Sequence, residues 1–232
     1  MINSEKKHAA ALKAAFPYTV PIFTGFIFLG MTYGVLMSKN GFNFLYPMFM
    51  SMTIFAGSME FIAANLLLQA FNPLNAFLMT LMINARHLFY GISMLEKYKG
   101  IKKYKPYLIF GLCDESFSIN CTANIPHGVD HGLFMFYVTL LNQIYWVAGS
   151  TLGGIFGSVL KFNTEGLDFV MTAMFAVIFV EHWKSAKTHI PAVCGLFISL
   201  ACLCVFGADN FMIPTMLAIL AVLTVLRSFL EK

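Results

Sequence analysis

The chain has 232 residues, of which 59% are hydrophobic and only 11% are charged. Soluble domains carry about 25% charged residues, and so few polar side chains exclude an ordinary soluble fold because they cannot cover a water-facing surface. The formal net charge is +4, with the lysines and arginines mainly at the N-terminus and in short connections. Clusters of this kind are topology signals of membrane proteins and do not indicate a nucleic-acid-binding surface. We therefore expect one transmembrane domain, residues 1–232, surrounded by the lipid bilayer and without a nucleic-acid partner.

Taken in chain order, eight apolar stretches have about the length needed to cross roughly 30 Å of hydrocarbon as helices. They are residues 16–37, 44–70, 73–95, 107–125, 133–160, 167–183, 190–207 and 211–230. The connections are short and rich in turn residues, so no soluble domain fits between them. Lipid penalises unpaired backbone groups, and the stretches lack the alternation of barrel strands. The sequence predicts an all-α integral membrane protein, a polytopic bundle of seven or eight hydrophobic segments.

Two basic clusters bear on the orientation of these segments. One precedes the stretch at 16–37, which is too long for a signal peptide and is expected to remain as the first span; the other covers residues 97–105. The positive-inside rule places both clusters in the cytoplasm, whereas three full spans would separate them. A broken helix at 44–70 that enters and leaves on one side would resolve the conflict, and Ala56-Gly57-Ser58 suits such a break. We predict discontinuous helices, and a second Ala-Gly-Ser at 148–150 is consistent with an inverted repeat.

Charged and polar side chains inside the apolar stretches mark the candidate site. A charge at the centre of a spanning helix costs about 2.5–3.5 kcal/mol on insertion scales, so each one requires a reason. The candidates for the substrate path are Gly57, Ser58, Glu60, Asn65, Asn84 and Arg86, and those for proton coupling are Glu60, His87, Asp114 and Glu115. We expect Arg86 to pair with one or more of these acids in a water-accessible cavity, because unpaired buried charges cost more. The alternative is an ion pair that only holds helices together.

An amino acid would suit such a cavity because it carries both a carboxylate and an ammonium group. Arg86 and the N-termini of half-helices would supply donors to the carboxylate, and Glu60 would accept from the ammonium. Gly57 and Ser58 could open the backbone just before Glu60 and present further polar groups. An acid lining the cavity could also take up and release a proton, which would tie transport to the proton gradient.

Other patterns point away from metal and phosphate chemistry. His127 and His131 have metal-like spacing but follow Pro126 in an expected loop, so a solvated loop is favoured over a metal site. The five cysteines are expected to be buried thiols. We expect no metal and no cofactor, and the sequence contains neither a Walker A motif nor a dinucleotide-binding fingerprint. An ATP-driven transporter would therefore need an ATPase on another chain.

Two further function classes remain open beside a secondary transporter. One is the permease subunit of an ATP-driven amino acid transporter. The other is an intramembrane enzyme that would use Asp114, Glu115 and His87. No recognisable nucleophile or metal set accompanies these residues, so we do not expect an enzyme.

An ordered set of motifs gives the chain a resemblance to a known family. It comprises Pro-Tyr-Thr-Val-Pro at 17–21, Gly30 with Gly34, Phe-Ala-Gly-Ser at 55–58, Asn84-Ala-Arg-His-Leu-Phe-Tyr-Gly91, Asp114-Glu115 with Phe117, and Gly-Leu-Asp-Phe at 166–169 followed by Ala-Met-Phe at 173–175. Together they resemble the AzlC-type large subunits of branched-chain amino acid exporters, over nearly the whole chain. The resemblance implies a multi-pass permease of the bacterial inner membrane that works with a small hydrophobic AzlD-type subunit. It also implies export of leucine, isoleucine, valine or methionine-like substrates. The family usually carries Gln at the position of Glu60, so the acid here implies an added proton site or an altered substrate.

Overall fold

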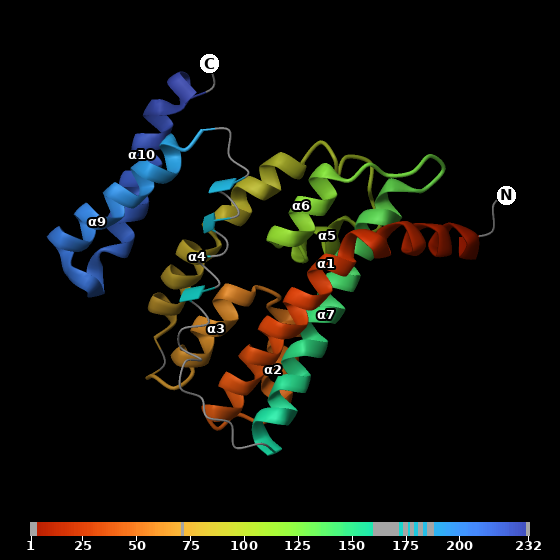
Figure 1. Ribbon diagram of the computed structural model, residues 1–232, viewed down its shortest axis with the longest axis horizontal. Coiled ribbons are helices and arrows are strands. Elements are labelled where there is room, and N and C mark those ends of the chain that lie inside the picture. The colour runs from red at the N-terminus through yellow and green to blue at the C-terminus, as the bar shows by residue number, and fades with distance from the viewer. Residues whose placement is uncertain are drawn as a thin grey trace. The chain divides into compact units, whose positions relative to one another are not determined.

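The computed structural model describes residues 4–70, 72–159, 172–173, 176, 179–180, 183–184 and 188–230. The described residues form α-helices and no strand, which confirms the predicted all-helical class (Figure 1). Three of these helices are long and apolar enough to cross a membrane, at Glu5–Lys39, His131–Val159 and Ile190–Gly207. The chain divides into two compact units, Met1–Leu167 and Asp168–Lys232. The count of seven or eight spans and the single domain stay predictions.

Helices α1 (Ser4–Lys39) and α7 (His131–Val159) run side by side and form the frame of the first unit (Figure 1). Small residues allow this close packing: a Cβ added to Gly149 would lie 2.8 Å from the carbonyl oxygen of Ile27. Helix α1 begins well before the predicted stretch at 16–37, because the preceding residues are mostly Ala and Lys, which favour helix.

The predicted break at 44–70 is confirmed. Helix α2 covers Leu45–Thr53 and helix α3 covers Gly57–Leu66, separated by Ile54, Phe55 and Ala56. Phe55 has φ of 47°, in the left-handed region that residues with a Cβ rarely adopt. Gly57 opens α3 against the indole of Trp146, where an added Cβ would lie 3.0 Å from the ring. The break therefore faces α7.

A second break interrupts the stretch at 107–125, which the sequence analysis treated as one continuous segment. Helix α5 covers Lys105–Phe110 and helix α6 covers Asp114–Thr122, with Gly111, Leu112 and Cys113 between them. Gly111 disfavours helix, Cys113 is extended (φ −101°, ψ 176°), and the α6 sequence is the least apolar of the stretch. Helix α6 is about 14 Å long and cannot cross the hydrocarbon alone. The prediction of one continuous segment at 107–125 was therefore wrong.

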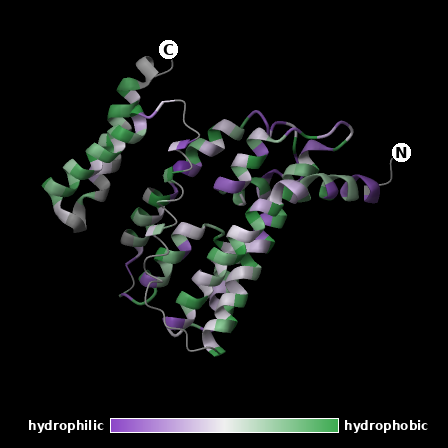
Figure 2. Cartoon of the chain, in the orientation of Figure 1, coloured by the Kyte–Doolittle hydropathy of each residue, from purple (hydrophilic) through white to green (hydrophobic). Residues whose placement is uncertain are grey.

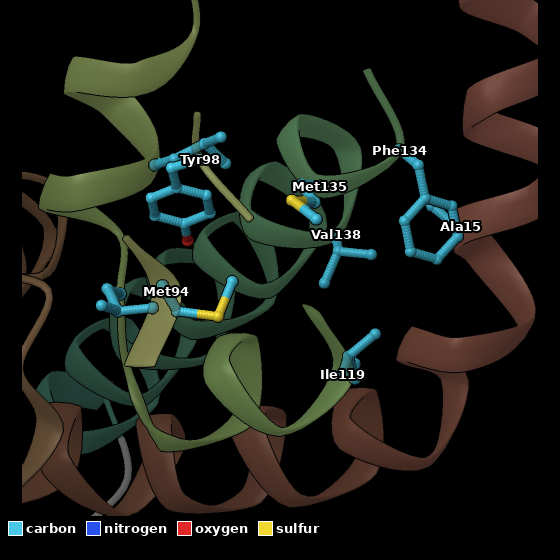
Figure 3. Packing of buried hydrophobic residues seen from close by; sticks show 9 residues of the cluster. Ala15, Met94, Tyr98, Ile119, Phe134, Met135 and Val138 are labelled. Atoms are coloured by element: carbon cyan, nitrogen blue, oxygen red, sulfur yellow. The ribbon is translucent and has the colours of Figure 1, made fainter. Parts of the chain in front are cut away.

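Helix α4 (Pro73–Met94) connects the two broken segments, and its proline occupies the first helical position, where no intrahelical N–H bond is lost. The polar connection from α4 to α5 includes the basic cluster at 97–105 and is visible as the hydrophilic stretch in Figure 2. A buried apolar cluster joins α1, α4, α5, α6 and α7 (Figure 3). It comprises Ala15, Met94, Tyr98, Leu108, Leu112, Ile119, Phe134, Met135 and Val138. This cluster fixes the position of α6 and therefore of the charged residues at its start.

The second unit contains helices α9 (Ile190–Asn210) and α10 (Met212–Leu230), which pack against each other. A kink at Gly207, with φ of 72°, precedes the turn between them. Both helices are strongly apolar yet exposed, with Val205 74% and Val225 73% accessible. Such surfaces suit contact with lipid, and Figure 2 shows them as hydrophobic along their length. The predicted segment at 167–183 lies largely outside the described residues.

Candidate functional site

A row of polar side chains lies along one face of α7, at the three- and four-residue spacing of a helical stripe. Thr139, Asn142, Trp146 and Ser150 are all buried. Ser150 Oγ lies 2.7 Å from Ser51 Oγ in α2, and Asn142 Nδ2 donates to Ser116 Oγ in α6 at 3.3 Å. Helix α7 therefore holds both broken segments through the same face. These residues were not among the predicted site residues, although polar positions that recur at this spacing within a predicted span indicate a buried polar face.

Glu60 is fully buried in the first turns of α3 and receives its hydrogen bonds from two directions. Trp146 Nε1 donates to both carboxylate oxygens, at 3.0 and 3.1 Å, and the backbone N–H of Ala56 donates to Oε1 at 3.1 Å. The carboxylate thus satisfies a backbone donor that the break leaves without its helical acceptor, as a capping glutamate does. Pairing of Glu60 with Arg86, one of the sequence-based alternatives, is not observed.

Arg86 of α4 instead bridges the starts of the two half-helices that follow the breaks. Its Nη1 lies 2.9 Å from Asp114 Oδ2, and its Nη2 donates to Ser58 Oγ at 3.3 Å. Ser58 and Glu60 are two residues apart and project about 200° from each other on a helix. This explains why Ser58 reaches α4 while Glu60 reaches α7. The predicted ion pair is formed by Asp114.

The Arg86–Asp114 pair keeps unused hydrogen-bonding capacity. Among the described residues, Arg86 Nε and Asp114 Oδ1 are buried atoms without a partner in hydrogen-bonding geometry. The side chains as a whole are 29% and 23% exposed, so the pair is not sealed off. Tyr90 lies beside Asp114 and stacks on Phe117, with 4.4 Å between the ring centroids. The pair therefore includes one unsatisfied donor atom and one unsatisfied acceptor atom, both buried, close to the stacked rings of Tyr90 and Phe117.

The other candidate residues lie at varying distances from this pair. Glu115 follows Asp114 and is half-buried, and His87 follows Arg86, with its Nδ1 3.2 Å from the carbonyl oxygen of Asn84. Asn65 is exposed in the last turn of α3, away from the half-helix starts. The geometry therefore brings together Ser58, Arg86 and Asp114, whereas Gly57 and Glu60 face Trp146 of α7.

No group of three His, Cys, Asp or Glu side chains in the described part of the chain is placed to hold a metal ion. His127 lies in the loop before α7, as predicted, whereas His131 is the first residue of α7, so its placement in the loop was wrong.

The role of Glu60 in holding the break can be tested by substitution. Glu60→Gln keeps an oxygen for the Ala56 and Trp146 donors, so we expect a stable protein. Glu60→Leu leaves the buried N–H of Trp146 and the partly buried N–H of Ala56 unpaired, at a cost of about 1–3 kcal/mol for a fully buried group. Thermal unfolding of the purified protein in detergent should show a clear loss of stability for the leucine variant only. Equal stability of both variants would contradict the capping role.

Taken together, the apolar exposed helices and the interrupted segments with buried charges define a helical membrane protein of the kind that has discontinuous helices. The chain belongs to the AzlC family: the family described as "AzlC protein" matches residues 21–160, more than half of the chain. It is 64% identical to the branched-chain amino acid transport protein AzlC of Bacillus subtilis (strain 168), over 100% of this chain and 91% of that protein.

More distant relatives are membrane proteins as well. The chain is 51% identical to an uncharacterized membrane protein of Haemophilus influenzae, covering 95% of this chain and 91% of that one. It is 25% identical to the inner membrane protein YgaZ of Escherichia coli (strain K12), covering 88% and 82%. No solved structure matches the chain. The predicted family is thus confirmed.

Proposed function

We propose that this chain is a secondary transporter of small neutral amino acids, of the branched-chain or methionine-like type, in the bacterial inner membrane. It exports its substrate, coupled to protons, as the large subunit of a two-component exporter with a small AzlD-type membrane protein. The names of the Bacillus and Escherichia relatives support the substrate class and the membrane. The resemblance of the sequence supports the partner and the direction.

The observation that carries this proposal is the Arg86–Asp114 pair between the N-termini of α3 and α6. The free Arg86 Nε and the helix N-termini suit the carboxylate of an amino acid, because both are donors with positive character. Asp114 Oδ1 suits the ammonium group. The rings of Tyr90 and Phe117 beside the pair offer an apolar contact for the side chain. The substrate carboxylate would bind Arg86 and the substrate ammonium would bind Asp114. Both charged side chains would therefore keep a partner if the substrate replaced part of the contact between them.

Proton coupling is assigned to acids near the same pair. Glu115 is half-buried and adjacent to Asp114, and Glu60 lies on the other face of α3. An acid in this setting can exchange its proton when the path opens to water on either side. His87, the neighbour of Arg86, is the remaining candidate.

The test uses proteoliposomes that contain both subunits. We expect counterflow of labelled leucine or methionine, and net export driven by an imposed pH gradient. The absence of flux for every amino acid tested under such a gradient would overturn the proposal. Flux that instead requires ATP and an associated ATPase chain would favour the alternative of a permease subunit of an ATP-driven transporter.

Asp114→Asn should separate substrate binding from folding. The amide can still accept from Arg86, so we expect the protein to accumulate normally. Loss of the negative charge removes the partner of the substrate ammonium, so the KM for labelled leucine should rise by about tenfold or more, as expected for a lost charge-assisted hydrogen bond. An unchanged KM in the counterflow assay would remove Asp114 from the binding site.

A further inference from the structure

The break between α2 and α3 separates a backbone donor from its helical acceptor and gives each a side-chain partner. In a continuous α-helix the N–H of Ala56 would donate to the carbonyl of Met52, four residues earlier. Here Ala56 N–H donates to Glu60 Oε1 at 3.1 Å, and the Met52 carbonyl accepts from Gln143 Nε2 at 3.0 Å. Glu60 and Gln143 together replace both halves of one lost helical bond.

The broken form is opposed by the local backbone. Phe55 has φ of 47°, which is disfavoured for a residue with a Cβ because that atom crowds the following carbonyl. Rewinding of Ile54, Phe55 and Ala56 into a continuous helix would relieve this conformation and restore backbone hydrogen bonds. Side chains from outside the segment must therefore hold it broken. A segment with two competing forms is the kind of element that can change during transport.

Gln143 also reaches the second broken segment. Its Oε1 accepts a hydrogen bond from the hydroxyl of Tyr107 in α5, at 2.6 Å, shortly before the break at Gly111. One amide thus binds the end of α2 with its nitrogen and α5 with its oxygen. Trp146 lies one turn further along α7 and donates to Glu60, at the other end of the first break. The rings of Phe55 and Phe110 are also close, with centroids 6.4 Å apart.

We propose that Gln143 is a positioning residue that holds the α2–α3 segment broken and ties this break to α5. It thereby keeps the first turns of α3 and α6 at the separation that Arg86 spans. When Gln143 releases the Met52 carbonyl, Ile54, Phe55 and Ala56 can rewind into a continuous helix. Ser58 then moves away from Arg86, and the binding site is lost. This inference rests on the proposed function and adds to it the element that assembles the site.

The experiment compares variants of the two-subunit complex in a Trp183→Phe background. The chain has two tryptophans, so with a small subunit that carries no tryptophan, Trp146 is then the reporter of its own bond to Glu60. We expect Gln143→Leu to shift the Trp146 emission and to raise the KM for labelled leucine in exchange by about tenfold, the effect of losing one ordinary hydrogen bond. The maximal exchange rate should change less than the KM. Tyr107→Phe removes only a hydroxyl and should shift the Trp146 emission and the KM in the same direction as Gln143→Leu. It takes the place of Gln143→Leu if that variant does not fold.

A second substitution at Phe55 distinguishes positioning from simple packing. Glycine adopts a positive φ without strain and disfavours helix, so Phe55→Gly should restore the KM and emission of the Gln143→Leu variant. Phe55→Ala removes the same ring but keeps a Cβ, so it should not restore them. Unchanged KM and emission in Gln143→Leu, or equal rescue by glycine and alanine, would overturn the inference. If the unsubstituted complex exchanges no leucine, the proposed function fails, while the Trp146 emission still decides whether Gln143 holds the break.

Discussion

Arg86→Ala is expected to reduce leucine transport by the proposed two-subunit complex by about a hundredfold or more, without preventing membrane insertion. The guanidinium contacts both half-helix starts, through Ser58 and Asp114. Loss of a charged hydrogen bond costs up to about 3 kcal/mol, which corresponds to roughly a hundredfold in an equilibrium or rate. Transport by proteoliposomes, normalised to inserted protein, provides the measurement.

Three companion variants define the cause of that loss. Arg86→Lys keeps the charge but lacks the planar fork that reaches two partners, so we expect partial activity. Lys103→Ala removes an exposed lysine outside the site and should transport normally. Removal of both charges, Arg86→Ala with Asp114→Ala, should recover stability lost on leaving one charge unpaired, yet should not recover transport. Normal transport by Arg86→Ala would instead assign the ion pair to a purely structural role.

The two breaks show what the sequence could and could not predict about the fold. The first was predictable because Ala56-Gly57-Ser58 interrupts an unusually long apolar stretch and lies just before a buried acid. The second was not, because a single Gly111 within an apolar run resembles the many glycines that pack inside membrane helices. The interruption there depends on the tertiary contacts of α6 with α4 and α7. The hydropathy of one segment does not predict these tertiary contacts.

The sequence was enough to predict which charged residues belong to the candidate site, but not which side chains they bind. The expectation that Arg86 pairs with an acid is met by Asp114, since a buried guanidinium needs a counter-charge. Glu60 pairs with Trp146 instead, and Gln143 binds Met52, because α7 lies along the break. These contacts join residues more than 80 positions apart. Residue spacing within one segment therefore could not identify them, whereas the polar stripe on α7 could have suggested that some such partner exists.

The seam between α1 and α7 should be the least tolerant part of the fold to added volume. A Cβ at Gly34 would fall within 2.7 Å of backbone atoms of Ser150, Gly153 and Gly154. Backbone atoms cannot move aside as a flexible side chain can, so Gly34→Ala must push the two helices apart. Overpacking of this kind costs about 3 kcal/mol, or roughly 6–12 °C in the midpoint of thermal unfolding. Gly153→Ala should act in the same way, because its Cβ would meet the backbone of Met31.

Gly25→Ala is the matched control, since it adds the same methyl group to the same helix. Among the described residues, no atom outside the adjacent turns of α1 lies within 4 Å of a Cβ placed at Gly25, and alanine favours helix over glycine by about 1 kcal/mol. We therefore expect Gly25→Ala to leave the unfolding midpoint unchanged or slightly raised, while Gly34→Ala lowers it. The polar contacts of Trp146 and Ser150 depend on the same seam, so Gly34→Ala should also reduce transport by the protein that remains folded. Equal midpoints for the two variants would mean that α1 and α7 are not held together at these glycines.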